Sequence, residues 1–356
     1  MIPKFYIIGS ETKRPSSRKT IFTDGSPDQT FRENTDIELS HWIPNRTAKQ
    51  YRADTSTEIC MRFIEDEAPG DWDLAINNHL DIDGILSVFS LVHSEIAKKH
   101  KQTIIEAAEM GDFWAWGSES SQILFQGLTL FMNNLQQDLL DIQDIYAQSF
   151  NKTIELLESR VHDKIIQNGI ISLAQSYERV QSGAITRVEL GKRFVHYHLP
   201  ASLTASDRSK ALKIPGFNDL LQDDMWLYPQ VRNKLDKEKI QLVSAETDEG
   251  TYYDLWYPGY MWADTPHSWR APGFSFAGST NAYYYGYAPL SDAVEELRRL
   301  ETGGGTWKLV KQLTPFSSIQ GRNYPVVLSC MNDQDEPQKS KIPKAEVAYI
   351  LARAFV

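Results

Sequence analysis

The chain has 356 residues, which is long for one hydrophobic core and predicts two domains or one large domain with insertions. Its hydrophobic (41%) and charged (24%) fractions are ordinary for a globular protein, and no stretch is apolar for long enough to span a bilayer. The formal net charge of −10 disfavours sequence-independent binding of extended nucleic acid, which depends on neutralising phosphates, although a local basic groove stays open.

Two observations concern the compartment. Cys60 and Cys330 lie far apart in apolar sequence, so we expect two buried thiols in a reducing environment. The N-terminal residues MIPKFYIIGSETKRP lack the apolar core of a signal peptide. We therefore expect a cytoplasmic protein that does not enter a membrane.

The first part of the chain alternates predicted strands with predicted helices. Residues 4–8 predict a strand, residues 9–34 a polar loop, and residues 37–42 a second strand. A helix is expected to begin at residues 54–56, where an N-cap precedes an acidic first turn, and to run through Ile64. This alternation predicts an α/β fold with a parallel or mixed sheet flanked by helices.

Residues 74–87 are the most informative run. They predict a buried strand that ends in a turn carrying His79, Asp81 and Asp83, followed by Gly84 and an amphipathic helix over residues 85–99. The i, i+2, i+4 spacing sends the three side chains to one side of an extended or turning backbone. An imidazole and two carboxylates at the carboxyl end of a strand suit a divalent metal such as Mn2+, or Mg2+.

A structural explanation of the same run is also available. Asp, Asn and Gly cluster at turns and helix N-caps, and Asp83 alone would suffice to cap the helix after Gly84. A cap needs one such residue, whereas this run combines a histidine and two aspartates with Asn77 and Asn78. We therefore favour a metal or ligand site.

The string His79-x-Asp81-x-Asp83-Gly84 resembles the first motif of the DHH phosphoesterase superfamily. That superfamily includes single-strand exonucleases, phosphodiesterases of short RNA and cyclic dinucleotides, and the family II pyrophosphatases. The resemblance implies a DHH-like metal-binding domain over residues 1–120. It also implies a further ligand at the end of the next strand, for which Asp112, expected in a short loop after a glycine, is the candidate. An ordinary helix C-cap at this glycine is the alternative.

The chain also departs from that superfamily. It contains no Asp-His-His triplet, and the glycine run at residues 303–305 resembles the superfamily's C-terminal glycine motif only faintly. The resemblance therefore supports the N-terminal fold more than two-metal hydrolysis. One metal, a different reaction, or a lost activity stay open.

The rest of the chain divides into a helical part and a second α/β half. Residues 121–185 carry leucines at helical spacing and predict a helical connector or insertion. Residues 186–356 predict an α/β substrate-binding domain. Its expected strands lie at 186–190, 194–199, 240–244, 251–257, 306–313 and 326–329, and its expected helices at 291–300 and 344–354.

Two further groups of residues are candidates for chemistry. His196 and His198 lie two apart on a predicted strand, so both face one side and suit either an anionic substrate or a metal, or else stand solvated on an exposed face. The aromatic, Gly- and Pro-rich segment of residues 252–287 predicts a substrate-binding wall, with packing or an interface as alternatives. Its candidate substrate-binding residues are Trp256, Tyr260, Trp262, His267 and Arg270.

A smaller feature lies earlier in the chain. His41 and Trp42 stand before the helix start at residues 54–56, whose free N–H groups would suit an anion. We favour a capped helix and a packed tryptophan there.

These patterns together predict a divalent-metal-dependent hydrolase. The resemblance implies a phosphoester or phosphoanhydride substrate, in a small molecule or short oligonucleotide. His196 or His198 would stabilise charge or protonate the leaving group. The alternatives are a metal-dependent hydrolase of an amide-type bond on the same scaffold and a non-catalytic protein that binds a nucleotide or metabolite. A homodimer is left open.

Overall fold

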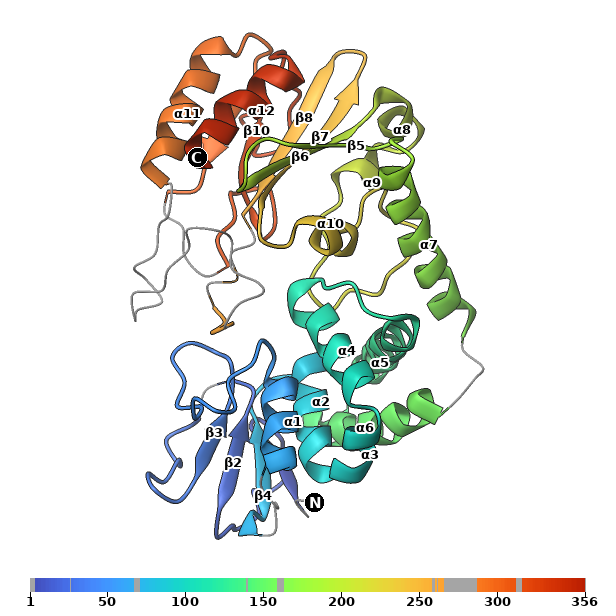
Figure 1. Ribbon diagram of the computed structural model, residues 1–356, viewed down its shortest axis with the longest axis vertical. Helices are drawn as coiled ribbons and strands as arrows, with labels where there is room; N and C mark the ends of the chain where they lie inside the picture. The colour runs from blue at the N-terminus through green and yellow to red at the C-terminus, as the bar shows by residue number, and fades with distance from the viewer. Residues whose placement is uncertain are drawn as a thin grey trace. The chain divides into compact units, whose positions relative to one another are not determined.

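The computed structural model describes residues 4–355 except 26, 67–70, 139, 159–162, 258–259, 261, 266–286 and 312–315. The chain divides into two compact units (Figure 1). Unit 1 comprises residues 1–172, 216–222 and 263–267, and unit 2 comprises residues 173–215, 223–262 and 268–356. The division at residue 172 falls inside the stretch of residues 121–185 that was predicted as a helical connector or insertion.

The sheet of unit 1 is parallel and has the strand order β1-β4-β2-β3. The strands are β1 (Phe5–Ile7), β2 (Thr20–Thr23), β3 (Ile37–Leu39) and β4 (Leu74–Asn77). The prediction of a continuous loop over residues 9–34 is wrong, because β2 lies inside it. Strand β2 has only four residues, so the sequence pattern that would predict it is short. All four are buried and pair with strands on both sides, so the strand is stabilised by tertiary pairing.

Helices of unit 1 cover this sheet. They are α1 (Ser56–Asp66), α2 (Ile82–Val92), α3 (Ser94–Lys99), α4 (Lys101–Phe113), α5 (Glu119–Gln137) and α6 (Ile142–Glu158). Helices α1 and α2 pack on each other and on the strands, as Figure 1 shows. Helix α6 closes the β1 edge, where the Gln143 side chain accepts from Ile7 N at 2.9 Å and donates to Phe5 O at 3.0 Å. The helix predicted over residues 85–99 begins earlier and breaks at His93.

Helix α7 (Lys164–Gln181) spans the division between the units. The sheet of unit 2 is mixed, with the order β5-β6-β7-β8-β10-β9, in which β6 and β7 are parallel. The strands are β5 (Thr186–Glu189), β6 (Phe194–Leu199), β7 (Ile240–Thr247), β8 (Gly250–Trp256), β9 (Thr306–Leu309) and β10 (Val326–Met331). The α/β class and the strands predicted for this half are thus confirmed.

The helices of unit 2 are α8 (Ala201–Ser206), α9 (Arg208–Leu212), α10 (Pro229–Asp236), α11 (Tyr287–Leu300) and α12 (Lys344–Ala352), followed by a short 3-10 helix, η2 (Arg353–Phe355). Helices α11 and α12 lie side by side and share one apolar core with the sheet (Figure 1). Helices α8, α9 and α10 lie outside the predicted elements. Among the described residues, no helix combines the length and apolarity that crossing a bilayer requires.

Candidate metal centre

Three neighbouring strands of unit 1 each deliver one potential metal ligand just beyond their carboxyl ends. Asp24 follows β2, His41 follows β3 by two residues, and His79 follows β4 by two residues. The strands are parallel and adjacent in the order β4-β2-β3, so their ends meet at one edge of the sheet. This is the edge at which open α/β sheets bind ligands, and Asp24 stands in its middle.

The first group of ligand atoms comes from Asp24, His79 and Asp81. His79 Nε2 lies 3.0 Å from Asp24 Oδ2 and 3.0 Å from Asp81 Oδ2. The buried atoms Asp24 Oδ2 and His79 Nε2 nevertheless have no partner with hydrogen-bond geometry among the described residues. Ligand atoms of the three residues lie within 4.8 Å of one another, which suits a shared cation.

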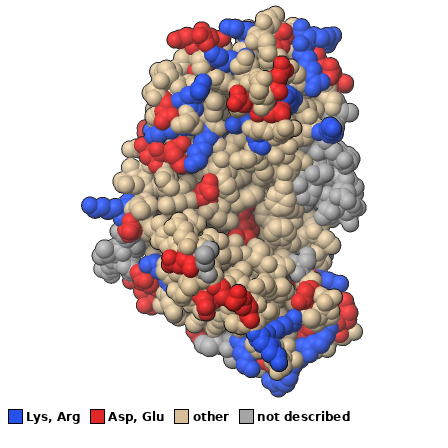
Figure 2. All heavy atoms as spheres, turned by 180° about the vertical axis from the view of Figure 1, so that it is seen from behind, with Lys and Arg blue, Asp and Glu red and all other residues tan. Residues whose placement is uncertain are grey.

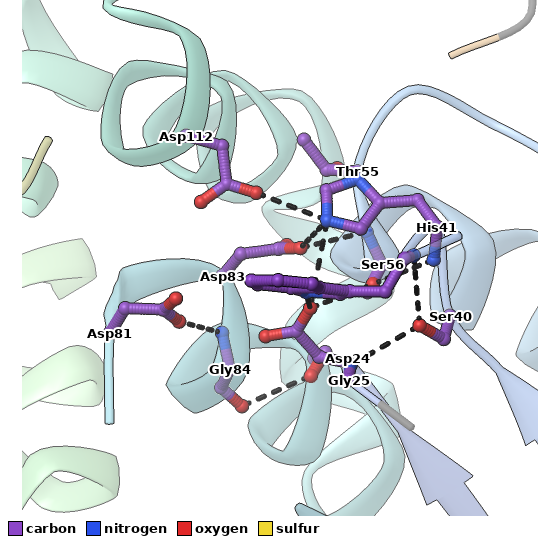
Figure 3. A network of polar contacts seen from close by, with 12 residues as sticks. Asp24, Gly25, Ser40, His41, Thr55, Ser56, Asp81, Asp83, Gly84 and Asp112 are labelled. Atoms are coloured by element: carbon purple, nitrogen blue, oxygen red, sulfur yellow. Dashed lines mark hydrogen bonds and ion pairs between the residues drawn. The ribbon is translucent and has the colours of Figure 1, made fainter. Parts of the chain in front are cut away.

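The second group shares Asp24 and adds His41 and Asp83. His41 Nε2 lies 3.6 Å from Asp24 Oδ1 and 3.6 Å from Asp83 Oδ2, and these three residues also present ligand atoms within 4.8 Å of one another. Asp112 Oδ2 approaches the same nitrogen at 3.3 Å (Figure 3). We call the six residues Asp24, His41, His79, Asp81, Asp83 and Asp112 the metal centre.

Both imidazoles are oriented by a hydrogen bond at the other ring nitrogen. His41 Nδ1 lies 2.5 Å from the carbonyl oxygen of Asp54, and His79 Nδ1 lies 2.8 Å from Asn78 Oδ1. Both partners accept, so each Nδ1 carries the hydrogen and Nε2 faces the carboxylates. Histidines that bind metals are commonly fixed in this way.

Asp83 is held by the start of another helix. The backbone N–H groups of Ser56 and Thr57, in the first turn of α1, each donate to its carboxylate at 2.8 Å. The Asp83 carboxylate is therefore the anion at the N-terminus of α1. The structural explanation of the sequence run made Asp83 the cap of α2, but the capping residue is Asp81, whose Oδ1 accepts from Gly84 N at 2.7 Å. The Asp81 carboxylate both caps the helix and faces His79.

Asp24 is fixed through its other oxygen. Its Oδ1 accepts from Trp42 Nε1 and from Ser56 Oγ, each at 3.0 Å (Figure 3). Asp24 is 1% exposed and its backbone has a φ of +45°, a left-handed conformation that is uncommon for a residue other than glycine. Strained backbone of this kind concentrates at functional sites.

Gly84 is required by the close packing behind Asp81. A Cβ at this position would lie 2.3 Å from Asn77 Nδ2, 2.8 Å from the Tyr146 hydroxyl and 3.0 Å from Asp81 Oδ1. Tyr146 OH in turn donates to His79 O at 2.7 Å and lies 2.8 Å from Asn77 Nδ2. The glycine therefore allows the turn to fold tightly onto α6.

The electrostatics of the centre favour a cation. Burial and the neighbouring Asp24 raise the pKa of Asp83 to about 6, and burial together with Asp83 and Asp81 raises the pKa of Asp112 well above its ordinary value. Burial alone would lower the pKa of His79, but Asp81 and Asp24 raise it to about 12. Four carboxylates converge on two histidines, so a divalent ion would relieve their repulsion.

The structure assembles more of the centre than the sequence predicted. His79 and Asp81 are brought together as expected, whereas Asp83 lies with His41 in the second group. Asp24 was missed because it lies in the segment predicted as a loop, and His41 was assigned to packing. Parallel pairing of β2 with both β3 and β4 places Asp24 and His41 at the same sheet edge as His79.

Asp112 reaches the centre from a different element than expected. The prediction of a loop after Gly111 is wrong, because α4 continues to Phe113 and ends at Trp114 with a φ of +47°. Gly111 lies within the helix, where a Cβ would lie 3.1 Å from Ile82 Cβ. The glycine thus serves close packing against α2, and Asp112 projects from the last turn of α4.

His196 and His198 lie in unit 2 on β6, and both are 6% exposed, so they are not the solvated pair of the alternative explanation. Ser244 Oγ lies 2.7 Å from His196 Nε2 and 3.0 Å from His198 Nδ1, and Glu246 Oε2 lies 2.9 Å from His198 Nε2. Burial, with His198 and Lys344 nearby, lowers the pKa of His196 to about 3. An imidazole that is neutral at pH 7 does not favour the predicted role as a proton donor.

The structure describes only part of the segment predicted as an aromatic substrate-binding wall. Trp256, Tyr260 and Trp262 are buried in unit 2, at 4%, 1% and 5% exposure, and the Arg232 guanidinium lies 3.8 Å from the ring centroid of Trp256. His267 and Arg270 lie outside the described residues.

One short piece of that segment belongs to unit 1. Ala263 forms a β-bridge with Trp42, and Asp264 N donates to His41 O at 2.6 Å. Asp264 also forms an ion pair with Arg52 at 3.0 Å. The segment therefore contacts the backbone that carries one of the two histidines of the metal centre.

Residues 5–180 match the model of a family described as a family of unknown function (DUF6687). The match contains all six residues of the metal centre and ends before His196. A search of curated proteins and a search of solved structures found no match. The similarity extends over the centre without attaching an activity to it.

Proposed function

We propose that the protein is a divalent-metal-dependent hydrolase that binds two ions, with Asp24 as the ligand common to both. The observation that carries this proposal is the arrangement of the two ligand groups at one sheet edge, which share Asp24 and each contain a histidine whose Nε2 faces carboxylates. Mixed imidazole and carboxylate ligands suit Mn2+, with Mg2+ as the second candidate.

Ions held there would polarise a substrate oxygen and supply a nucleophile from water at neutral pH. The residues of the chain would set the geometry. The N-terminus of α1 fixes Asp83, the capping bond to Gly84 fixes Asp81, and Trp42 with Ser56 fixes Asp24. Hydrogen bonds of this kind orient ligand side chains, which metal-assisted hydrolysis requires.

We propose a phosphoester in a small molecule or short oligonucleotide as the substrate. The net charge is −10, and among the described residues of the face in Figure 2 the Lys and Arg side chains are interspersed with Asp and Glu. This distribution supports a small substrate over extended nucleic acid. The buried free thiols of Cys60 and Cys330 support a cytoplasmic location. Roles for His196 and His198 in catalysis stay predictions.

Metal analysis and a substrate panel test the proposal together. Purified protein would be loaded with Mn2+, its metal content measured, and its turnover compared on phosphomonoesters, cyclic and linear dinucleotides, and amides. Asp24→Asn should lose both metal and turnover, while Asp71→Asn, at a side chain that is 83% exposed, should keep both. Turnover of amides alone would favour the amide hydrolase, and metal binding without turnover would favour a binding protein. A wild-type protein that binds no divalent ion would overturn the proposal.

A further inference from the structure

A cavity in unit 1 lies beside the edge strand β3. It measures about 290 Å³, near the lower end of small-molecule pockets. Strand β3 lies at the edge of the sheet of unit 1. The cavity is lined by residues before β3, on β3 itself, after it, and on α1. None of the six residues of the metal centre lines it.

The polar feature of this cavity is a buried carboxylate with one free oxygen. The Glu38 side chain is 0% exposed. Its Oε2 accepts from Arg46 N at 3.0 Å and lies 3.7 Å from Arg46 Nη1, whereas its Oε1 has no hydrogen-bond partner among the described residues. A buried polar atom left without a partner is unfavourable, so a ligand that donates to Oε1 would recover free energy.

The charged groups around the cavity favour a cation. Glu33, Asp36 and Glu38 line it together with a single described guanidinium, that of Arg46. Both carboxylate oxygens of Asp36 already accept hydrogen bonds, from Arg32 and from the Thr20 N–H. Glu38 is therefore the buried acid that remains available.

The Arg46 side chain makes two contacts besides those with Glu38. Its Nε lies 3.5 Å from Glu33 Oε1, and its guanidinium carbon lies 5.0 Å from the ring centroid of Phe31. Burial, opposed by Arg46, raises the pKa of Glu38 to about 7. A bound cation would stabilise the ionised carboxylate that this environment otherwise disfavours.

Aromatic rings form the apolar wall. Tyr51 and Phe63 meet edge to face with ring centroids 5.5 Å apart, and Phe63 meets Trp72 in the same way at 6.2 Å. Lys19 Nζ lies 5.4 Å from the Trp72 ring centroid, so this ring already contacts one cation. Aromatic faces beside a carboxylate are the usual environment for an organic cation.

We infer that this cavity is a binding site for a small, flat organic cation whose N–H groups donate to Glu38 Oε1 and whose apolar body packs against Tyr51, Phe63 and Trp72. Aromatic amidines satisfy both demands. The inference does not depend on the proposed hydrolase activity, because it uses none of the metal ligands.

Calorimetric titration of the full chain with benzamidine tests this site. Benzamidine should bind wild type, and Glu38→Gln should weaken binding by about tenfold, because an amide replaces a buried carboxylate of similar shape. Benzoate, which has the same ring and the opposite charge, should not bind. The matched control is Glu95→Gln, at a side chain that is 85% exposed and does not line the cavity, and it should change the affinity by less than about threefold.

Three outcomes would overturn the inference. They are no binding of benzamidine to wild type, equal binding to a folded Glu38→Gln variant, or binding of benzoate in preference to benzamidine. If Glu38→Gln does not fold, wild-type crystals soaked in benzamidine decide the question. An amidinium next to Glu38 Oε1 would support the site, and an empty cavity or a ligand elsewhere would contradict it.

Discussion

At the scale of single residues, Asp24 connects the two halves of the metal centre. One of its oxygens faces His79, and the other accepts from Trp42 and Ser56 beside His41. The two histidines differ in their surroundings, since the His41 side chain is 0% exposed and that of His79 is 28% exposed. Their loss should therefore have different consequences.

Replacing each histidine separately tests whether two ions bind. His79→Asn should remove about one of two Mn2+ ions with little loss of stability, because its side chain is partly exposed. His41→Asn should remove the other ion and also lower the melting temperature, because the buried bond to Asp54 O is lost. Metal content per chain and thermal unfolding measure both effects. Loss of all metal in both variants would indicate a single site.

Glu38 should make stability depend on pH. Its pKa is about 7 in the folded chain and near its ordinary value of 4.5 when unfolded, so the folded state binds more protons between these values. The free energy of unfolding should fall as pH rises through this range, by up to about 3 kcal/mol in unliganded protein. Urea unfolding at about pH 5 and about pH 8 measures the fall. Glu38→Gln should make the fall smaller without abolishing it, because Asp83 and Asp112 also have raised pKa values and contribute to it. Glu95→Gln, at an exposed side chain, should keep the wild-type fall. A wild-type fall in Glu38→Gln would refute the assignment.

At the scale of elements, the turn between β4 and α2 combines structure with chemistry. Asp81 caps α2 and faces His79, while Asp83 in the first turn of α2 accepts from the first turn of α1. The same carboxylates that would bind metal therefore hold two helices in place. A change that disturbs this turn should affect metal binding and stability together.

Gly84→Ala is the sharpest such change. The new Cβ would meet Asn77 Nδ2 at 2.3 Å and Tyr146 OH at 2.8 Å, so the turn must shift, at a cost of about 1–3 kcal/mol. We expect a lower melting temperature and weaker Mn2+ binding. Gly127→Ala in α5 is the matched control, because the three atoms nearest to its new Cβ would all belong to the Leu156 side chain, away from the metal centre. Its Mn2+ affinity should stay that of wild type. Wild-type metal binding by Gly84→Ala would show that the turn does not position the ligands.

At the scale of the whole molecule, the two units have separate sheets and the metal centre belongs to unit 1. Removing metal with a chelator should leave the buried carboxylates without a balancing cation and destabilise unit 1. Hydrogen exchange should rise in peptides covering β2, β3 and α2, while β6 and β7 of unit 2 stay protected. Added Mn2+ should restore protection. Exchange that is unchanged by chelation, or that rises equally in both units, would contradict a structural link between metal and unit 1.

The local features of the fold could be predicted from short stretches of the sequence. The strand, turn and helix around His79, Asp81, Asp83 and Gly84 follow from residues close together in the chain, because turn chemistry, capping and hydrophobic periodicity act over a few residues. For the same reason the helix beginning near Ser56 was predicted correctly, as were the strands of unit 2 and the α/β class.

The residues that complete the metal centre come together through contacts between distant parts of the chain. Asp24 and His41 join it because β2 and β3 lie parallel beside β4, and Asp112 joins it because α4 packs against α2. The short, wholly buried β2 has a weak local signal, since its stability comes from pairing on both sides. Strand order and helix packing depend on contacts between distant residues, which local spacing does not encode.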